Sequence, residues 1–282
     1  MNIFYSSSCL DYHSPGHPES PERVRSVAGY LKSKGFPFLV PVPCSMEDLL
    51  LVHDPRMIQA VRGGTFVDPD TPCLPGIFGY AALAAGSAIC AMRDAVGGRT
   101  AFSLMRPPGH HATPTRVMGF CYFNNMAIAS ARFLADCPLK RIAILDIDCH
   151  HGNGTEDFAL GRDRILYVSL HQSPLYPGTG LESPMNCVNF PLPPFTGEAP
   201  YMAALESACD RIREFNPELL GVSAGFDTYE EDPLTQLKLK VSSYRKMGRM
   251  ISRISCPMFI VLEGGYAEKL SSCVLQFIEG ME

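Results

Sequence analysis

The sequence lacks the signals of several large protein classes. It has no run of about 18 apolar residues, so no membrane-spanning helix is expected. Its N-terminus has neither a basic start nor a long apolar stretch, so we expect no secretory signal peptide. Lys and Arg number 24 against 29 Asp and Glu, a net charge of −5, which argues against nucleic acid as a partner. Internal repeats and low-complexity segments are also missing.

Paired cysteines are missing as well. The 11 cysteines include no CxxC pair, and their number is odd. Most of them lie in apolar stretches that are typical of helices or strands, as Cys90, Cys209 and Cys256 do. This usage favours buried, reduced thiols in a cytoplasmic protein over a disulfide framework.

The 282 residues, 46% of them hydrophobic, suffice for a sizeable core, and we expect one domain over residues 1–282. Capping and periodicity predict helices, of which the clearest has Pro21 at its first position and ends at Gly35. The Pro-rich segment 189–200 is expected to be a loop. The predicted helices cover residues 20–35, 45–53, 54–64, 76–98, 123–136, 200–215 and 239–254.

Apolar runs alternate with these helices. Residues 141–148, 164–171, 218–226 and 257–265 are apolar almost without interruption, which is typical of strands buried on both faces of a parallel sheet. Residues 2–6 and 100–105 are two further strand candidates. The βαβα order predicts a three-layer α/β domain.

Polar side chains follow the predicted strands where each strand ends. They are Asp146, Asp148, His150, His151, Ser169, His171, Asp227, Tyr266, His110 and His111. In open α/β sheets, ligands bind beyond the carboxyl ends of the strands. Taken singly, each of these residues has an ordinary explanation, such as a helix N-cap or a surface histidine. Their joint occurrence at neighbouring strand ends favours one functional site.

That site is predicted to hold a metal ion. Asp148 and His150 are two residues apart, so on extended backbone they point to one side, and Asp227 would arrive from a neighbouring strand. Three protein ligands of this kind leave coordination positions for water and substrate, as in catalytic zinc sites. The charge of the ion would also offset the burial of two carboxylates.

The motifs RPPGHHA, GFCYFNNMAIA, DIDCHHGNGTEDF, YVSLHQSPLYPGTG, SAGFDTYEEDPL and LEGGY together resemble the histone-deacetylase-like amidohydrolases, over nearly the whole chain. The resemblance implies an arginase/deacetylase fold, with a parallel eight-stranded sheet between helices. It implies Zn²⁺ held by Asp148, His150 and Asp227, with Fe²⁺ as an alternative.

The resemblance also implies roles for the neighbouring residues. His111 would be the general base and later the general acid, His110 would be held by Asp146, and Tyr266 would donate to the developing oxyanion. Asp70 matches a rim residue that grips the substrate backbone, and Arg23 matches an arginine near an internal cavity. The implied walls of an acyl-lysine tunnel are Gly119, Phe120 and Tyr176. A structural K⁺ ion would bind Asp146, Asp148, His150, Ser169 and Leu170, partly through backbone carbonyls.

Two positions differ from some relatives. Asn153 stands where some carry an aspartate behind the second histidine, so the pKa of His111 is expected to be lower than it would be there. Leu234 stands where polyamine-selective members carry a glutamate, which disfavours a second ammonium group in the pocket. Glu230, Glu231 and Asp232 form either an acidic rim or a solvated turn.

The sequence therefore predicts a zinc-dependent deacylase that removes acetyl or other acyl groups from the ε-amine of lysine in proteins or peptides. One alternative is a deacetylase of small acylated amines such as acetylpolyamines. Another is a metal-binding protein that recognises acylated ligands with little activity. The complete set of implied catalytic residues argues against this last alternative, and the single set of metal ligands argues against a ureohydrolase. Membranes and nucleic acids are not expected as partners.

Overall fold

The computed structural model describes residues 1–138 and 140–282 of the chain. Within these residues, eight strands form one sheet in the order β2-β1-β3-β8-β7-β4-β5-β6, and every neighbouring pair is parallel. The strands are β1 (Asn2–Phe4), β2 (Phe38–Leu39), β3 (Ala101–Ser103), β4 (Ile142–Asp146), β5 (Ile165–Gln172), β6 (Cys187–Leu192), β7 (Leu219–Ala224) and β8 (Met258–Leu262).

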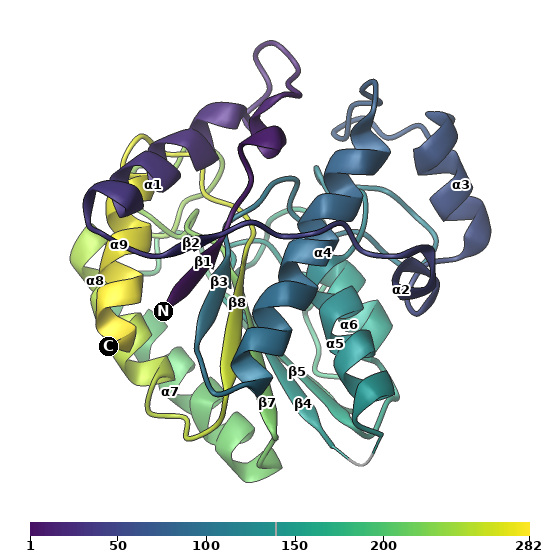
Figure 1. The fold of residues 1–282 in the computed structure, drawn as a ribbon. Coiled ribbons are helices and arrows are strands. Elements are labelled where there is room, and N and C mark those ends of the chain that lie inside the picture. The colour runs from purple at the N-terminus through teal and green to yellow at the C-terminus, as the bar shows by residue number, and fades with distance from the viewer. Residues whose placement is uncertain (139) are drawn as a thin grey trace.

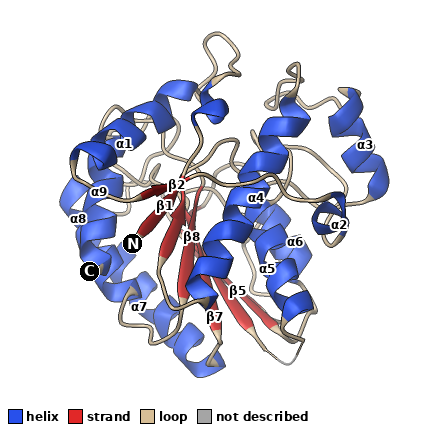
Figure 2. Ribbon diagram, in the orientation of Figure 1, coloured by secondary structure: helices blue, strands red, loops and turns tan. Residues whose placement is uncertain are grey.

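Helices cover both faces of the sheet (Figures 1 and 2). One hydrophobic core joins the sheet to α1, α7, α8 and α9, and a second core joins the opposite face to α3, α4 and α5. The predicted three-layer α/β architecture is therefore confirmed. The helices are α1 (Pro21–Ser33), α2 (Met46–Leu50), α3 (Pro55–Gly63), α4 (Ile77–Val96), α5 (Asn125–Asp136), α6 (Asn153–Ala159), α7 (Glu198–Phe215), α8 (Val241–Ile251) and α9 (Leu270–Met281), with a short 3₁₀ turn at Ser7–Leu10.

The four long apolar runs form the centre of the sheet. All residues of β4, β5, β7 and β8 are buried, because helices pack on both faces of these strands. Since all strands are parallel, their carboxyl ends lie at one edge, and the loops that follow β3, β4, β7 and β8 leave the sheet together. This arrangement brings chain segments more than 100 residues apart to one place.

The expectation of a loop over residues 189–200 is wrong at both ends, because residues 189–192 belong to β6 and residues 198–200 belong to α7. Cys187–Leu192 form β6, which pairs with β5 at the edge of the sheet. Pro191 lacks an N–H group, which normally speaks against a strand, but an edge strand tolerates this loss. Sequence patterns also did not reveal α6, α9 and the two-residue strand β2. Over the described residues, no helix is long and apolar enough to cross a membrane.

Candidate functional site

The three predicted metal ligands meet at the carboxyl edge of the sheet. Asp148 and His150 lie in the loop after β4, and Asp227 lies in the loop after β7, the neighbouring strand. One potential ligand atom from each side chain lies within 4.8 Å of the other two. His150 Nδ1 is 3.1 Å from Asp148 Oδ1 and 2.8 Å from Asp227 Oδ2.

The main chain orients both carboxylates. Asp148 Oδ2 accepts a hydrogen bond from Gly264 N at 2.7 Å, and Asp227 Oδ1 accepts one from Cys149 N at 2.8 Å. Both side chains are fully buried. Asp148 Oδ1 also accepts a hydrogen bond from His150 N at 2.9 Å, so backbone N–H groups orient both carboxylates around the imidazole of His150.

The donor set fits a divalent cation. Although Asp227 Oδ2 lies close to His150, their geometry is not that of a hydrogen bond, so this buried oxygen has no hydrogen-bond partner among the described residues. Burial and the charge of Asp148 raise the pKa of Asp227 to about 7. Buried carboxylates close together need a positive charge between them. Two carboxylates and one imidazole are a ligand set that Zn²⁺ accepts.

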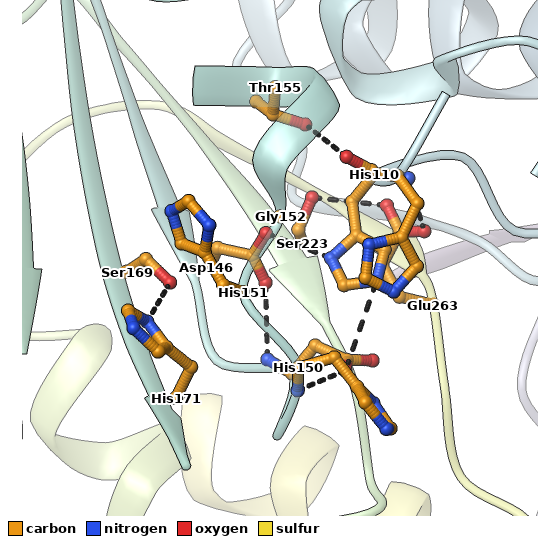
Figure 3. Close-up of polar contacts among 12 residues, drawn as sticks. His110, Asp146, His150, His151, Gly152, Thr155, Ser169, His171, Ser223 and Glu263 are labelled. Atoms are coloured by element: carbon orange, nitrogen blue, oxygen red, sulfur yellow. Dashed lines mark hydrogen bonds and ion pairs between the residues drawn. The ribbon is translucent and has the colours of Figure 1, made fainter. Parts of the chain in front are cut away.

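The predicted histidine pair lies beside this cluster. His110 and His111 follow β3, and the centroids of their rings are 4.0 Å apart. His110 Nδ1 is 3.1 Å from Asp146 Oδ2, and His111 Nδ1 is 2.9 Å from Asn153 Oδ1 (His110 and Asp146 are in Figure 3). The structure therefore places each histidine against the partner that the sequence analysis named for it.

The two imidazoles differ in basicity. Burial lowers the pKa of His110, but the charges of Asp148 and Asp146 outweigh it and raise this pKa to about 10. The pKa of His111 falls well below its usual value, because the ring is buried and feels the positive charges of His110 and His150. The main causes are burial and the neighbouring imidazoles, whereas the hydrogen bond with Asn153 acts in the opposite direction and raises the pKa of His111. Environments that separate the pKa values of two adjacent groups in this way are typical of acid–base sites.

A cavity of about 230 Å³ leads to these residues. Its lining includes every residue predicted for the tunnel and its rim. At the mouth, Tyr176 is 37% exposed and Leu234 is 36% exposed. The lining residues are Asp70, Pro108, His110, His111, Gly119, Phe120, His150, Leu175, Tyr176, Leu234, Gly264 and Tyr266.

Backbone conformation shapes one wall of this cavity. Gly119 has a φ of +57°, and a Cβ atom there would lie 2.5 Å from the ring of His111. Phe120 also has a positive φ of 68°, and its N–H donates to Thr71 Oγ1 at 2.9 Å. The ring of His17 packs edge-on against Phe120, with centroids 4.6 Å apart. No pattern in the sequence predicted this contact of His17.

The residues predicted to bind K⁺ also lie together. Asp146 and Ser169 are directly opposite each other on β4 and β5, and both are fully buried. Ser169 Oγ is 2.9 Å from His171 Nδ1. Arg23 lies behind the cavity rather than in its lining, with its guanidinium carbon 4.6 Å from the centroid of the Tyr266 ring.

Two buried carboxylates of the site were missed. Asp232 is only 6% exposed and accepts hydrogen bonds from Tyr266 N at 2.8 Å and from Leu234 N at 3.0 Å, so it belongs neither to an acidic rim nor to a solvated turn. Glu263 is fully buried and bonds to the backbone beside His110. A carboxylate directly after an apolar strand was the only signal in the sequence for Glu263.

Comparisons with known proteins find relatives over nearly the whole chain. The family model of the histone deacetylase domain matches residues 17–281. A probable deacetylase from Archaeoglobus fulgidus is 38% identical over 94% of this chain and 80% of its own length. The acetylpolyamine amidohydrolase 1 of Pseudomonas aeruginosa is 42% identical over 66% of this chain and 57% of its own length.

Two solved structures have folds similar to that of this chain. The acetylpolyamine aminohydrolase from Burkholderia pseudomallei is 28% identical, with a TM-score of 0.88 over 100% of this chain and 98% of that chain. The HDA15 HD domain is 29% identical, with a TM-score of 0.92 over 100% of this chain and 90% of that chain. The architecture is thus the arginase/deacetylase fold, here in a hydrolase that acts on amides. The chain belongs to the histone deacetylase family.

Proposed function

We propose that the protein is a zinc-dependent deacylase that hydrolyses the acylated ε-amine of lysine in proteins or peptides. The observation that carries this proposal is the cluster of Asp148, His150 and Asp227 at a cavity that His111 and Tyr266 also line. A protein that only bound acylated ligands would need neither a proton acceptor nor an oxyanion donor at this point.

Zinc fits the three ligands, and it would supply a bound water of lowered pKa and a polarised substrate carbonyl. Fe²⁺ is the alternative cation for the same three ligands. Amide hydrolysis adds the elements of water across the C–N bond and yields a carboxylate and an amine. The chain must therefore move a proton from the attacking water to the departing nitrogen.

His111 is the residue that we assign to this proton transfer. Asn153 Oδ1 only accepts hydrogen bonds, so its contact with His111 Nδ1 assigns the proton of the neutral ring to Nδ1. This tautomer leaves the lone pair of Nε2 available to take a proton from water and return it to the leaving amine. His110 contacts Asp146 through Nδ1, and this contact favours the charged form of its ring.

Tyr266 is assigned to the developing oxyanion. Its ring lines the cavity between Arg23 and Phe120, and its hydroxyl has no hydrogen bond within the described residues. A free hydroxyl at this position can donate to the substrate oxygen as negative charge develops there. Burial raises the pKa of this hydroxyl well above its usual value, so it remains a donor.

The cavity favours an acylated lysine side chain. Phe120, Tyr176 and Leu234 line the cavity and would supply apolar contact for the methylene stem, and we assign the contact with the peptide backbone to Asp70. We assign Gly119 to the same wall. We further propose that residues 1–282 act as one catalytic domain and that K⁺ binds at Asp146, Asp148, His150, Ser169 and Leu170.

A second candidate is a deacetylase of small acylated amines. Its support is the likeness to proteins described as acetylpolyamine amidohydrolases. Against it stands Leu234, because an apolar residue at the tunnel mouth offers no charge to a second ammonium group.

A substrate panel separates the candidates. Purified protein loaded with Zn²⁺ is incubated with acetyl-, butyryl- and longer acyl-lysine peptides and with acetylated polyamines, and the released amine is measured. We expect turnover of the peptides that a hydroxamate inhibits and that Asp227→Asn abolishes. Turnover of polyamines alone would support the second candidate, and absence of turnover with metal bound would contradict both.

A further inference from the structure

Glu263 lies at the end of β8 and is neither a predicted metal ligand nor part of the cavity lining. Its side chain is fully buried. Glu263 Oε2 accepts hydrogen bonds from Gly109 N at 2.7 Å and from His110 N at 3.2 Å, and Oε1 accepts one from Ser223 Oγ at 3.1 Å (Figure 3). This carboxylate therefore reaches from the strand that precedes Tyr266 to the backbone that carries the histidine pair.

The backbone of His110 is held on its other side as well. His110 O accepts hydrogen bonds from Gly154 N at 3.0 Å and from Thr155 N at 3.1 Å, at the start of α6. The residue is thus fixed through its N–H by Glu263 and through its carbonyl by α6. These contacts leave the backbone before His111 little freedom to rotate.

Close packing makes this anchoring specific. A Cβ atom at Gly109 would lie 2.4 Å from Asn125 N, so the segment runs directly against the start of α5. The backbone N–H groups of Gly109 and His110 have no acceptor other than Glu263 within the described residues. Without this carboxylate, two buried donors would be unpaired, and the segment would move to satisfy them.

We propose that Glu263 is a positioning residue, which sets the imidazoles of His110 and His111 through hydrogen bonds to the backbone of Gly109 and His110. This inference rests on the proposed function. The position of the histidine backbone depends on the length of the side chain and on its acceptor oxygen, not on its charge. A glutamine can keep both acceptor contacts through Oε1 and donate to Ser223 Oγ through Nε2.

The test compares three variants by kcat, KM, zinc content and thermal melting. Glu263→Met keeps the volume and removes the acceptors. We expect its kcat to fall about a hundredfold, the usual cost of a misplacement of about 1 Å, with KM and zinc content close to wild type. Glu263→Gln should restore kcat to within about threefold of wild type, since its hydrogen bonds are kept. Glu198→Gln, on α7 away from the site, is the control; it loses an ion pair with Lys246 but should match wild type in kcat, KM and zinc content.

If Glu263→Met does not fold, Glu263→Asp takes its place. The aspartate side chain is shorter, so its carboxylate cannot reach the N–H groups of both Gly109 and His110. It should lose kcat although it keeps the charge. Wild-type kcat in the Met or Asp variant would overturn the inference, and so would a folded, zinc-loaded Gln variant as inactive as Met. Failure of the wild-type protein to hydrolyse any acylated amine would instead refute the proposed function.

Discussion

The hydroxyl of Tyr266 offers the sharpest test of the proposed mechanism, because the structure predicts its removal to affect catalysis but not stability. The ring is held by Arg23 and Phe120, and the backbone N–H is held by Asp232, so Tyr266→Phe keeps all of these contacts. The hydroxyl itself has no hydrogen bond within the described residues. Loss of one oxyanion donor typically lowers kcat about 10²- to 10³-fold, or about 2.7–4 kcal/mol of transition-state stabilisation.

The assay is hydrolysis of an acetyl-lysine peptide with the metal content matched, together with thermal unfolding. We expect Tm to change by no more than about 2 °C, because no internal hydrogen bond is lost. Tyr201→Phe is the matched control: its buried hydroxyl also lacks a partner in the described part of the chain, but it lies outside the cavity. A Tyr266→Phe variant as active as Tyr201→Phe would remove Tyr266 from the mechanism.

Three further predictions concern the metal, the fold and the selectivity. Asp227→Asn should weaken zinc binding strongly. Substitution of a residue that only contacts a metal ligand already costs roughly 10–100-fold in metal affinity, and loss of a ligand should cost more. Full zinc occupancy after dialysis against a chelator would contradict this prediction. Glu19→Gln should destabilise the fold by about 3–5 kcal/mol in urea unfolding at pH 7, because it leaves buried Arg106 without its bidentate ion pair; an unchanged midpoint would refute this. The pairing with Arg106 outweighs burial and lowers the pKa of Glu19, so its contribution is complete above the unfolded pKa of about 4.3 and is lost as the pH falls through the lower folded value. Leu234→Glu should favour acetylpolyamines: the ratio of kcat/KM for an acetylpolyamine to kcat/KM for an acyl-lysine peptide should be about fivefold higher than in Leu234→Gln. This is the effect of a partly exposed ion pair of about 1 kcal/mol, and equal ratios in both variants would contradict the prediction.

The sheet and the metal cluster could be predicted from the sequence because both depend on local patterns. Uninterrupted apolar runs identified β4, β5, β7 and β8, and the polar residues after them were expected at one edge, where Asp148 and Asp227 are in fact found. The edge strand β6 could not be found in this way, because Pro191 is a loop signal whose cost vanishes only once its place at the edge is known.

The buried carboxylates of Glu263 and Asp232 could not be predicted from the sequence, for a different reason. Glu263 Oε2 bonds to N–H groups more than 150 residues away, and every residue except proline has such a group. No pattern of side chains therefore marks the contact. Asp232 is a similar case, since it bonds to the backbone of Leu234 and Tyr266. Only the fold shows which main-chain donors lie near a given carboxylate.

These contacts divide the site into a fixed part and an adjustable part. Buried carboxylates hold the backbone of His110 through Glu263 and that of Tyr266 through Asp232, so the reacting groups depend on contacts that solvent does not reach. At the mouth, Tyr176 and Leu234 are more than one-third exposed and pack less tightly. Substitutions at the mouth should therefore change KM and substrate preference at little cost in stability, whereas substitutions that remove the acceptor oxygens of the buried carboxylates should lower kcat for all substrates alike.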